Sequence, residues 1–161
     1  MISIQQNAEI TGGKVMKISI GCDHGGFDLK ELVVSHLKEN GHEVVDFGTY
    51  DKSSCDYPDF GIKAAKAVAD GECEKGIVIC TTGIGISIAA NKVKGIRCAL
   101  CSDQTQARLT REHNDANVLA LGAAITGHLS ALDIVDTFIS TEFSKLEKHA
   151  RRIEKIKAQE I

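Results

Sequence analysis

The sequence alternates five times between a short apolar segment and a segment with helical periodicity. The apolar segments lie at 17–21, 43–47, 77–80, 95–100 and 118–122. A polar turn follows the first, second and fourth segments, and a glycine loop follows the third. Apolar side chains recur every three or four positions in the residues after the first, second and fifth segments. Strands that alternate with helices form a parallel sheet covered on both faces. We therefore predict an α/β fold: a Rossmann-like, three-layer α/β/α sandwich on a five-stranded parallel sheet, with a C-terminal helix extension.

The ends of the chain differ from this repeating pattern. Residues 1–15 have little periodicity and finish near a Gly-Gly pair, so we expect a flexible leader before a single domain at 16–161. An added edge strand at 1–5 is the alternative. At the other end, residues 142–158 predict a helix with a thin apolar stripe of Phe143, Leu146, Ile153 and Ile156. So thin a stripe suits packing on a partner subunit better than burial in the domain's own core.

Composition excludes several classes of protein. The formal net charge is −3, aromatic residues make up 4% and Trp is absent, which disfavours nucleic-acid binding. No apolar run approaches about 18 residues, so no membrane-spanning helix is expected. Six cysteines occur without a recognisable secretory signal, which favours reduced thiols in a cytoplasmic protein.

The stretch from 76 to 91 is the strongest candidate for a functional site. It begins as a buried strand, passes through a small, flexible turn at 81–85, and continues as a helix from about residue 86 to 92. Cys80 then lies at the carboxyl end of a strand, the edge where ligands bind in open α/β sheets. Loop N–H groups and the helix dipole favour an anion there, and they also favour the ionised form of a nearby thiol.

A second polar turn is expected at the same edge of the sheet. Residues 22–25, Cys-Asp-His-Gly, follow the first strand, so Asp23, His24, Cys80 and Thr82 can line one cleft. A third polar corner, at 113–117, follows the fourth helix. Each residue alone has an ordinary explanation, because a strand-end cysteine is often just a small apolar side chain and an aspartate before a helix is often a cap. Two such turns on one edge favour a site.

Other ligand-binding motifs do not fit. The loop at 83–85 lacks the third Gly or Ala of a dinucleotide fingerprint, no acidic residue ends the next strand, and no Gly-Lys-Ser/Thr sequence is present. The loop from 80 to 87 has no Arg, which argues against thiol attack on phosphorus. Cys98 and Cys101 have C-x-x-C spacing, but no second pair at suitable distance completes a zinc ribbon. No metal site is predicted.

The last predicted helix is strongly basic. Lys145, Lys148 or His149, and Arg152 fall on one face at helical spacing. They either form a phosphate clamp or belong to a solvated face with pairs such as Glu147 and Arg151.

Together these motifs resemble the ribose-5-phosphate isomerase B family, within the ribose, allose and galactose phosphate isomerase superfamily. The resemblance covers about residues 16–157 and keeps the order and spacing of its motifs. These are Gly-Cys-Asp-His-Gly-Gly at 21–26, Asp-Tyr-Pro at 56–58, the glycine loop and helix at 80–92, Gly-Ile-Arg at 95–97 and His-Asn-Asp-Ala-Asn-Val-Leu at 113–119.

The resemblance implies an aldose–ketose isomerisation through a cis-enediol, with no metal or cofactor. Cys80 matches the catalytic base, Thr82 the hydroxyl that passes a proton between the sugar oxygens, and His113, assisted by Asp23, the residue that opens the furanose ring. The remaining matches are substrate contacts, and His24 and Arg152 among them are phosphate binders. These contacts are His24, Tyr57, Thr81, Gly83, Ile84, Gly85, Ser87, Asn114, Lys148 and Arg152.

The same resemblance implies a homodimer or tetramer with a shared active site, which His113 and the last helix reach from the neighbouring subunit. Two positions depart from the family pattern. Lys148 stands where an Arg is common, and Ala123-Ala124 follow Leu121-Gly122 where some relatives carry an Arg. Lysine binds phosphate as a point charge, without the planar fork of arginine. The expected substrate is ribose 5-phosphate; allose 6-phosphate or galactose 6-phosphate, or binding of a sugar phosphate without catalysis, are the alternatives.

Overall fold

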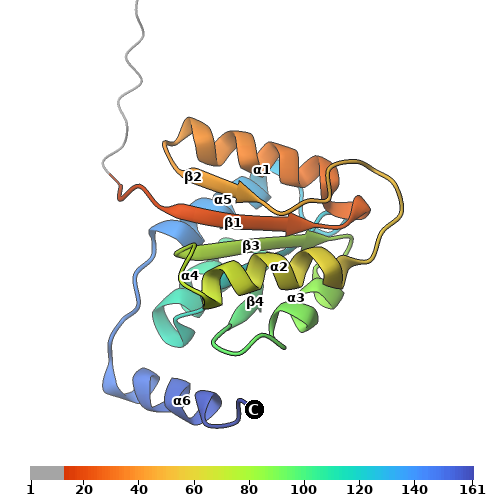
Figure 1. The fold of residues 1–161 in the computed structure, drawn as a ribbon. Helices are drawn as coiled ribbons and strands as arrows, with labels where there is room; N and C mark the ends of the chain where they lie inside the picture. Colours follow the sequence, from red (N-terminus) through yellow and green to blue (C-terminus); the bar gives the residue numbers. More distant parts are fainter. Residues whose placement is uncertain (1–12) are drawn as a thin grey trace, which may run out of the picture.

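A computed structural model describes residues 13–161 of the chain. Its five strands form one parallel sheet in the order β2-β1-β3-β5-β4 (Figure 1). The strands are β1 (Lys17–Cys22), β2 (Glu43–Asp46), β3 (Lys75–Cys80), β4 (Cys98–Leu100) and β5 (Val118–Gly122). The helices are α1 (Phe27–Glu39), α2 (Tyr57–Ala69), α3 (Ile84–Ala90), α4 (Gln104–Asn114), α5 (His128–Ser140) and α6 (Glu147–Lys157), with a 3₁₀ turn at His24–Gly26. The predicted α/β architecture is confirmed.

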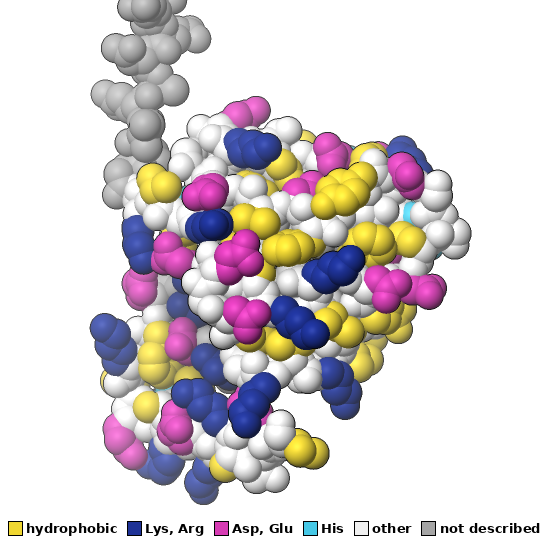
Figure 2. Space-filling view, viewed as in Figure 1, with side chains coloured by type: hydrophobic (Ala, Val, Ile, Leu, Met, Phe, Trp, Pro, Cys, Tyr) yellow, Lys and Arg dark blue, Asp and Glu magenta, His cyan; other side chains and the backbone are white. Residues whose placement is uncertain are grey.

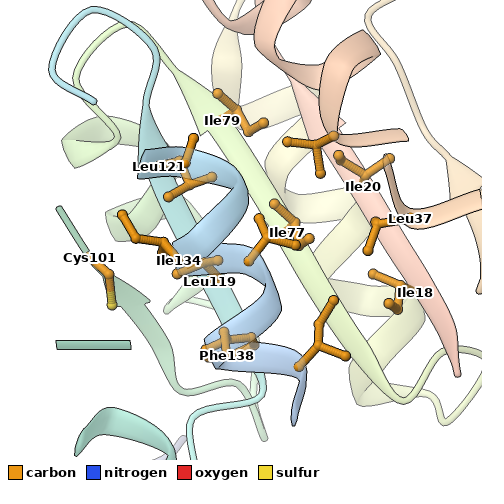
Figure 3. Close-up of a cluster of buried hydrophobic side chains, with 14 of the residues drawn as sticks. Ile18, Ile20, Leu37, Ile77, Ile79, Cys101, Leu119, Leu121, Ile134 and Phe138 are labelled. Carbon is orange, nitrogen blue, oxygen red and sulfur yellow. The ribbon is translucent and has the colours of Figure 1, made fainter. Parts of the chain in front are cut away.

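Two apolar clusters separate the helices into layers. On one face of the sheet, α1, α4 and α5 pack on Ile18, Ile20, Ile77, Ile79 and Leu119 (Figure 3). On the other face, α2 and α3 pack on a second cluster of buried strand side chains, among them Val78 and Ala120. Strand residues therefore point alternately to two cores, which explains why the strands are continuous apolar runs.

The connections create a crevice between two neighbouring strands. The chain leaves β1 toward α1 on one face, and it leaves β3 toward α3 on the opposite face. Because β1 and β3 are adjacent and parallel, the two chain segments that leave their carboxyl ends diverge to opposite faces and leave a crevice between them. Such a switch point is where open α/β sheets bind ligands.

The last helix departs from its predicted bounds. It begins at Glu147 instead of residue 142, and Lys145 has a left-handed backbone (φ 57°), so Lys145 does not share a helical face with Lys148 and Arg152. The cause is tertiary: the Ser144 N–H donates to the Glu112 carbonyl at the end of α4, which holds this segment extended. In Figure 1, α6 lies below the layers, at the end of that extended segment.

Smaller differences have similar causes. The fourth strand covers only 98–100, since Gly95 has φ 85° and the Asn117 side chain bonds Arg97 N–H and the Gly95 carbonyl in place of a ladder partner. The third helix begins at Ile84, two residues early. Leu129 fits the three-to-four-residue period of the apolar side chains of α5, which predicts a core position, but it is 81% exposed. Residues 1–12 of the expected leader, including the alternative strand at 1–5, lie outside the described residues; of the rest, Lys14 forms an ion pair with Glu74.

Candidate active site

The turn after β1 is held firmly at the switch point. The Asp23 N–H donates to the carbonyl of Ile79 on β3 (3.2 Å), and Asp23 Oδ1 accepts the N–H of Gly26 (3.1 Å). The Asp23 side chain therefore caps the 3₁₀ turn, the ordinary role that the sequence left open, and it is also nearly buried beside β3. His24 Nδ1 accepts the Cys55 N–H (3.2 Å), which leaves Nε2 as the imidazole nitrogen that carries the proton in the neutral ring.

The loop after β3 wraps around the Cys80 thiol. Cys80 is 4% exposed, and its Sγ accepts the N–H of Gly83 at 3.1 Å. Gly83 has φ 77°, a conformation that favours glycine, and a Cβ there would lie 2.8 Å from the Leu121 carbonyl carbon. The sharp turn at Gly83 is what aims its N–H back at the sulfur.

Some hydrogen-bonding groups of the other predicted loop residues are bonded within the loop, and others are available to a ligand. The Thr82 hydroxyl accepts the Ile84 N–H (3.2 Å), and Ser87 donates its hydroxyl to the Ile84 carbonyl (2.7 Å) and its N–H to Gly83. The Gly85 N–H, at the first turn of α3, donates to no other backbone group in the described residues. The loop thus uses several of its donors to fix its own shape and leaves the first turn of α3 to face a ligand.

Close packing joins the separate loops into one site. A side chain at Gly25 would collide with the Thr81 hydroxyl, so the turns after β1 and β3 touch. A Cβ at Gly85 would lie 2.6 Å from the ring of Tyr57, which places Tyr57 over the start of α3. Ten of the predicted residues therefore gather at the carboxyl edge of the sheet: Asp23, His24, Tyr57, Cys80, Thr81, Thr82, Gly83, Ile84, Gly85 and Ser87.

The other four predicted residues lie elsewhere. His113 and Asn114 end α4, and four residues after Asn114 the chain enters β5, where Val118 pairs with Gly76 at the amino end of β3. Cys80 lies four residues further along β3, on the order of 13 Å away. Lys148 and Arg152 lie on α6, which packs against α4. Within one chain, His113 and Cys80 are too far apart to contact the same five-carbon sugar.

His149, which helical spacing offered only as an alternative to Lys148 on the basic face, belongs to this second cluster. Its ring lies 4.4 Å from that of His113, centroid to centroid, and its Nδ1 is 2.8 Å from Ser144 Oγ. Burial lowers the pKa of His149, and the charges of His113, Lys148 and Arg152 lower it further. Figure 2 shows Lys and Arg side chains gathered over α6. Helical spacing could group these basic residues but could not show that His149 turns inward onto His113.

The lowered pKa of His149 predicts a pH-dependent stability. As pH falls below about 6.5, the unfolded chain binds the proton on His149 before the folded chain does, so the stabilisation present at higher pH is lost. We expect the free energy of unfolding to fall more steeply between about pH 7 and pH 5 in the wild type than in His149→Gln. Chemical denaturation at several pH values measures both slopes, and coincident slopes would contradict the prediction.

Residues 13–161 contain no group of three or more His, Cys, Asp or Glu side chains placed to bind a metal ion. The Cys98 and Cys101 thiols are free, and burial raises the pKa of each to about 12. In the same residues, no helix is long and apolar enough to cross a membrane.

Comparison with known proteins gives consistent results. The family described as Ribose/Galactose Isomerase matches residues 18–156. Ribose-5-phosphate isomerase B of Escherichia coli is 49% identical over 144 residues, covering 89% of this chain and 96% of that protein. Galactose-6-phosphate isomerase subunit LacB of Clostridium acetobutylicum is 45% identical over 141 residues, covering 88% and 82%.

Solved structures agree with the sequence relatives. The structure of ribose-5-phosphate isomerase B from Clostridium thermocellum is 58% identical, with a TM-score of 0.87, and the match covers 89% of this chain and 96% of that one. The type B enzyme of Trypanosoma brucei is 46% identical with the same TM-score, covering 90% and 99%. Each comparison aligns most of this chain with most of the relative, in sequence and in structure. This chain therefore belongs to the Ribose/Galactose Isomerase family.

Proposed function

We propose that the protein is a metal-independent aldose–ketose isomerase that interconverts ribose 5-phosphate and ribulose 5-phosphate through a cis-enediol. The observation that carries the proposal is the position of Cys80: a strand-end thiol at the switch point, held by the Gly83 N–H and two residues before Thr82 in the same loop. A thiolate is a suitable general base for a carbon acid near neutral pH. Family membership supplies the substrate class.

The reaction needs two proton transfers on carbon and one between oxygens. In the proposed mechanism the Cys80 thiolate removes the proton from C2 of the open-chain aldose and returns it to C1. Thr82 moves the hydroxyl proton of O2 to O1 while the enediol forms and collapses. All of these protons move between the substrate and the two side chains, which end in their starting protonation states, so the reaction consumes no further reactant.

The loop supplies the electrostatic part of catalysis. The N–H groups at the first turn of α3, Gly85 among them, stabilise the negative charge that develops on the enediolate oxygens, in the manner of an oxyanion hole. Tyr57, packed against Gly85, orients the sugar, and Asp23 assists ring opening from the neighbouring turn. These are the roles that the sequence resemblance implies, and the described loop geometry supports them.

We further propose that the active site is shared between two copies of the chain. His113, Asn114, Lys148 and Arg152 form a basic cluster that cannot reach Cys80 within one chain, whereas a second copy can bring them over its neighbour's crevice. Apolar side chains around α3 and β4 support such an interface: Ile84, Ile88 and Leu100 are 53%, 56% and 40% exposed. His113 of the second copy then opens the furanose ring, and Lys148 and Arg152 bind the phosphate with His24. The homodimer is the smallest such assembly, and a tetramer of two dimers is compatible with it.

A hexose phosphate is the second candidate substrate. Ala124 is exposed beside the loop, and its N–H donates to the Thr81 carbonyl (2.9 Å), so a short methyl group lies where some relatives carry an Arg. Lys148 likewise stands where an Arg is common, so fewer planar guanidinium groups bind the phosphate. The shorter side chain of Ala124 leaves space for a sixth carbon of the sugar. The LacB relative favours the same alternative.

We also infer a cytoplasmic location, since six free thiols suit a reducing compartment.

The proposal is tested with chelator-treated protein and ribose 5-phosphate in D₂O, followed by proton NMR. We expect ribulose 5-phosphate to form and the C2 proton of ribose 5-phosphate to be replaced by deuterium. A reaction that needs added metal would contradict the metal-independent mechanism. No exchange and no product would exclude the five-carbon substrate. The same measurement with allose 6-phosphate and galactose 6-phosphate then separates a hexose-phosphate isomerase from a protein that only binds sugar phosphates.

A further inference from the structure

A lysine is buried in the layer that covers β1. Lys30 belongs to α1, has no solvent exposure, and lies between the rings of Phe27 and Tyr50, with its Nζ 5.4 and 5.2 Å from their centroids. Its Nζ donates to Asp46 Oδ2 and to the Thr49 carbonyl, each at 2.7 Å, and Glu31 Oε1 lies at 3.3 Å. The ammonium group therefore joins α1 to the loop that follows β2.

That loop is in turn bonded to the end of β1. Asp46 Oδ1 accepts the Gly48 N–H at 2.8 Å, which fixes the start of the loop. The Gly48 carbonyl accepts the Cys22 N–H (2.6 Å), and the Thr49 N–H donates to the Cys22 carbonyl (2.8 Å). Both backbone groups of Cys22 are thus bonded to residues that Lys30 and Asp46 hold in place.

Cys22 immediately precedes the proposed catalytic turn. Asp23 is bonded to β3 on its other side, through Ile79, and its carboxylate caps Gly26 just before α1. The contacts close a ring: the turn at 23–26 starts α1, α1 carries Lys30, Lys30 holds the 46–50 loop, and the loop holds Cys22. The loop is therefore one of the supports that position Asp23 and His24 beside Cys80.

Stability alone is a poor explanation for a charge in this position. Taking an ammonium group and a carboxylate out of water is costly, and apolar residues of similar volume often stabilise a fold as well as a buried ion pair does. Burial lowers the pKa of Lys30, but the hydrogen bond and charge of Asp46, together with Glu31, raise it by more, so the lysine keeps its proton. What an apolar side chain cannot supply is the pair of directed bonds to Asp46 and Thr49.

We propose that Lys30 is a positioning residue, which acts through Asp46 and the 46–50 loop to hold Asp23 and His24 in the position relative to Cys80 that the reaction requires. The inference rests on the proposed isomerase function for its kinetic consequence. Its structural part is independent of that function, because the bonds to Cys22 exist without substrate.

The test compares three variants with the wild type. Lys30→Met removes the bridge and leaves the partly buried Asp46 carboxylate without its counter-ion, whereas Lys30→Met/Asp46→Asn removes the bridge and that negative charge together. Leu37→Ala is the control, since Leu37 lies on the same helix, is buried, and belongs to a core cluster that does not include the loop. Each protein is assayed well below its unfolding midpoint, with kcat and KM determined separately.

We expect the double variant to recover stability relative to Lys30→Met but to keep a kcat at least about tenfold below that of the wild type, because small misplacements of catalytic groups are costly. Leu37→Ala should lose stability and keep its kcat. If the double variant regains both stability and kcat, the positioning role is overturned.

Amide hydrogen exchange supplies a readout that does not depend on activity. We expect the Cys22 and Thr49 N–H groups of the double variant to exchange at least about tenfold faster than its global unfolding accounts for, and those of Leu37→Ala to track global unfolding. Unchanged protection would overturn the inference even for an active enzyme. A wild type that fails to isomerise any sugar phosphate would instead overturn the proposed function, and the exchange result would still decide the role of Lys30.

Discussion

Replacing Cys80 by Ala is expected to lower kcat for ribose 5-phosphate by about 10²–10⁴-fold, the range that a positioned general base contributes. Affinity for the sugar phosphate should change little, because the proposed phosphate and hydroxyl contacts come from other residues. The substitution is structurally conservative: Cys80 is small and buried, and its replacement mainly removes the hydrogen bond that Sγ accepts from the Gly83 N–H. Steady-state kinetics with a calorimetric binding measurement separate the two effects.

Two further variants distinguish the thiol's chemistry from its packing. Cys80→Ser keeps an acceptor for Gly83 but replaces the thiolate by a hydroxyl that is not ionised near neutral pH, so it should be nearly as slow as Cys80→Ala. Cys101→Ala is the matched control, because Cys101 is another buried thiol just beyond a strand, and burial followed by the charge of Asp103 raises its pKa to about 12. A Cys80→Ala protein with wild-type turnover, or a Cys101→Ala protein as slow as Cys80→Ala, would remove Cys80 from the mechanism.

The local part of this architecture is predictable from sequence because each signal is contained in a few residues. The run of β-branched residues before Cys80 predicts a buried strand, and Gly83 and Gly85 predict the turn that follows it. Strands that alternate with helices run parallel, so the turns after the first and third strands share one edge of the sheet. The ten site residues of that edge can accordingly be grouped by their positions along the chain alone.

Features that depend on tertiary contacts could not be predicted in this way. Residues 142–146 have a composition compatible with helix, but the bond from Ser144 to the end of α4 keeps them extended. Leu129 fits the helical period of α5 yet faces outward. Lys30 precedes Val34 by one turn on α1, and a sequence pattern cannot tell a buried, bridging lysine from one whose chain covers the surface. The separation of His113 from Cys80 follows from the parallel sheet, because α4 ends at its amino edge and Cys80 lies at its carboxyl edge. The strand order, with β5 beside β3, is what the sequence did not reveal.

That separation leads to the second large prediction: two inactive variants should restore activity to each other. In a shared site, Cys80 comes from one subunit and His113 from its partner. A mixed dimer of Cys80→Ala and His113→Ala therefore contains one site with both changes and one site with neither. Random assortment of equal amounts makes about half of the dimers mixed, so the mixture should recover about a quarter of wild-type activity.

The experiment uses two affinity tags to isolate the mixed dimers after co-expression, and these should have about half of the wild-type turnover per dimer. Mixing Cys80→Ala with Thr82→Ala is the matched control. Both residues lie on the loop after β3, so each site of that mixed dimer carries one defect and no activity should return. If the isolated mixed dimers, with Cys80→Ala in one subunit and His113→Ala in the other, stay inactive, the shared site is contradicted. Because α4 ends at the amino edge of the sheet and Cys80 lies at the carboxyl edge, recovery requires that the two subunits pack with their sheets running in opposite directions, amino edge beside carboxyl edge.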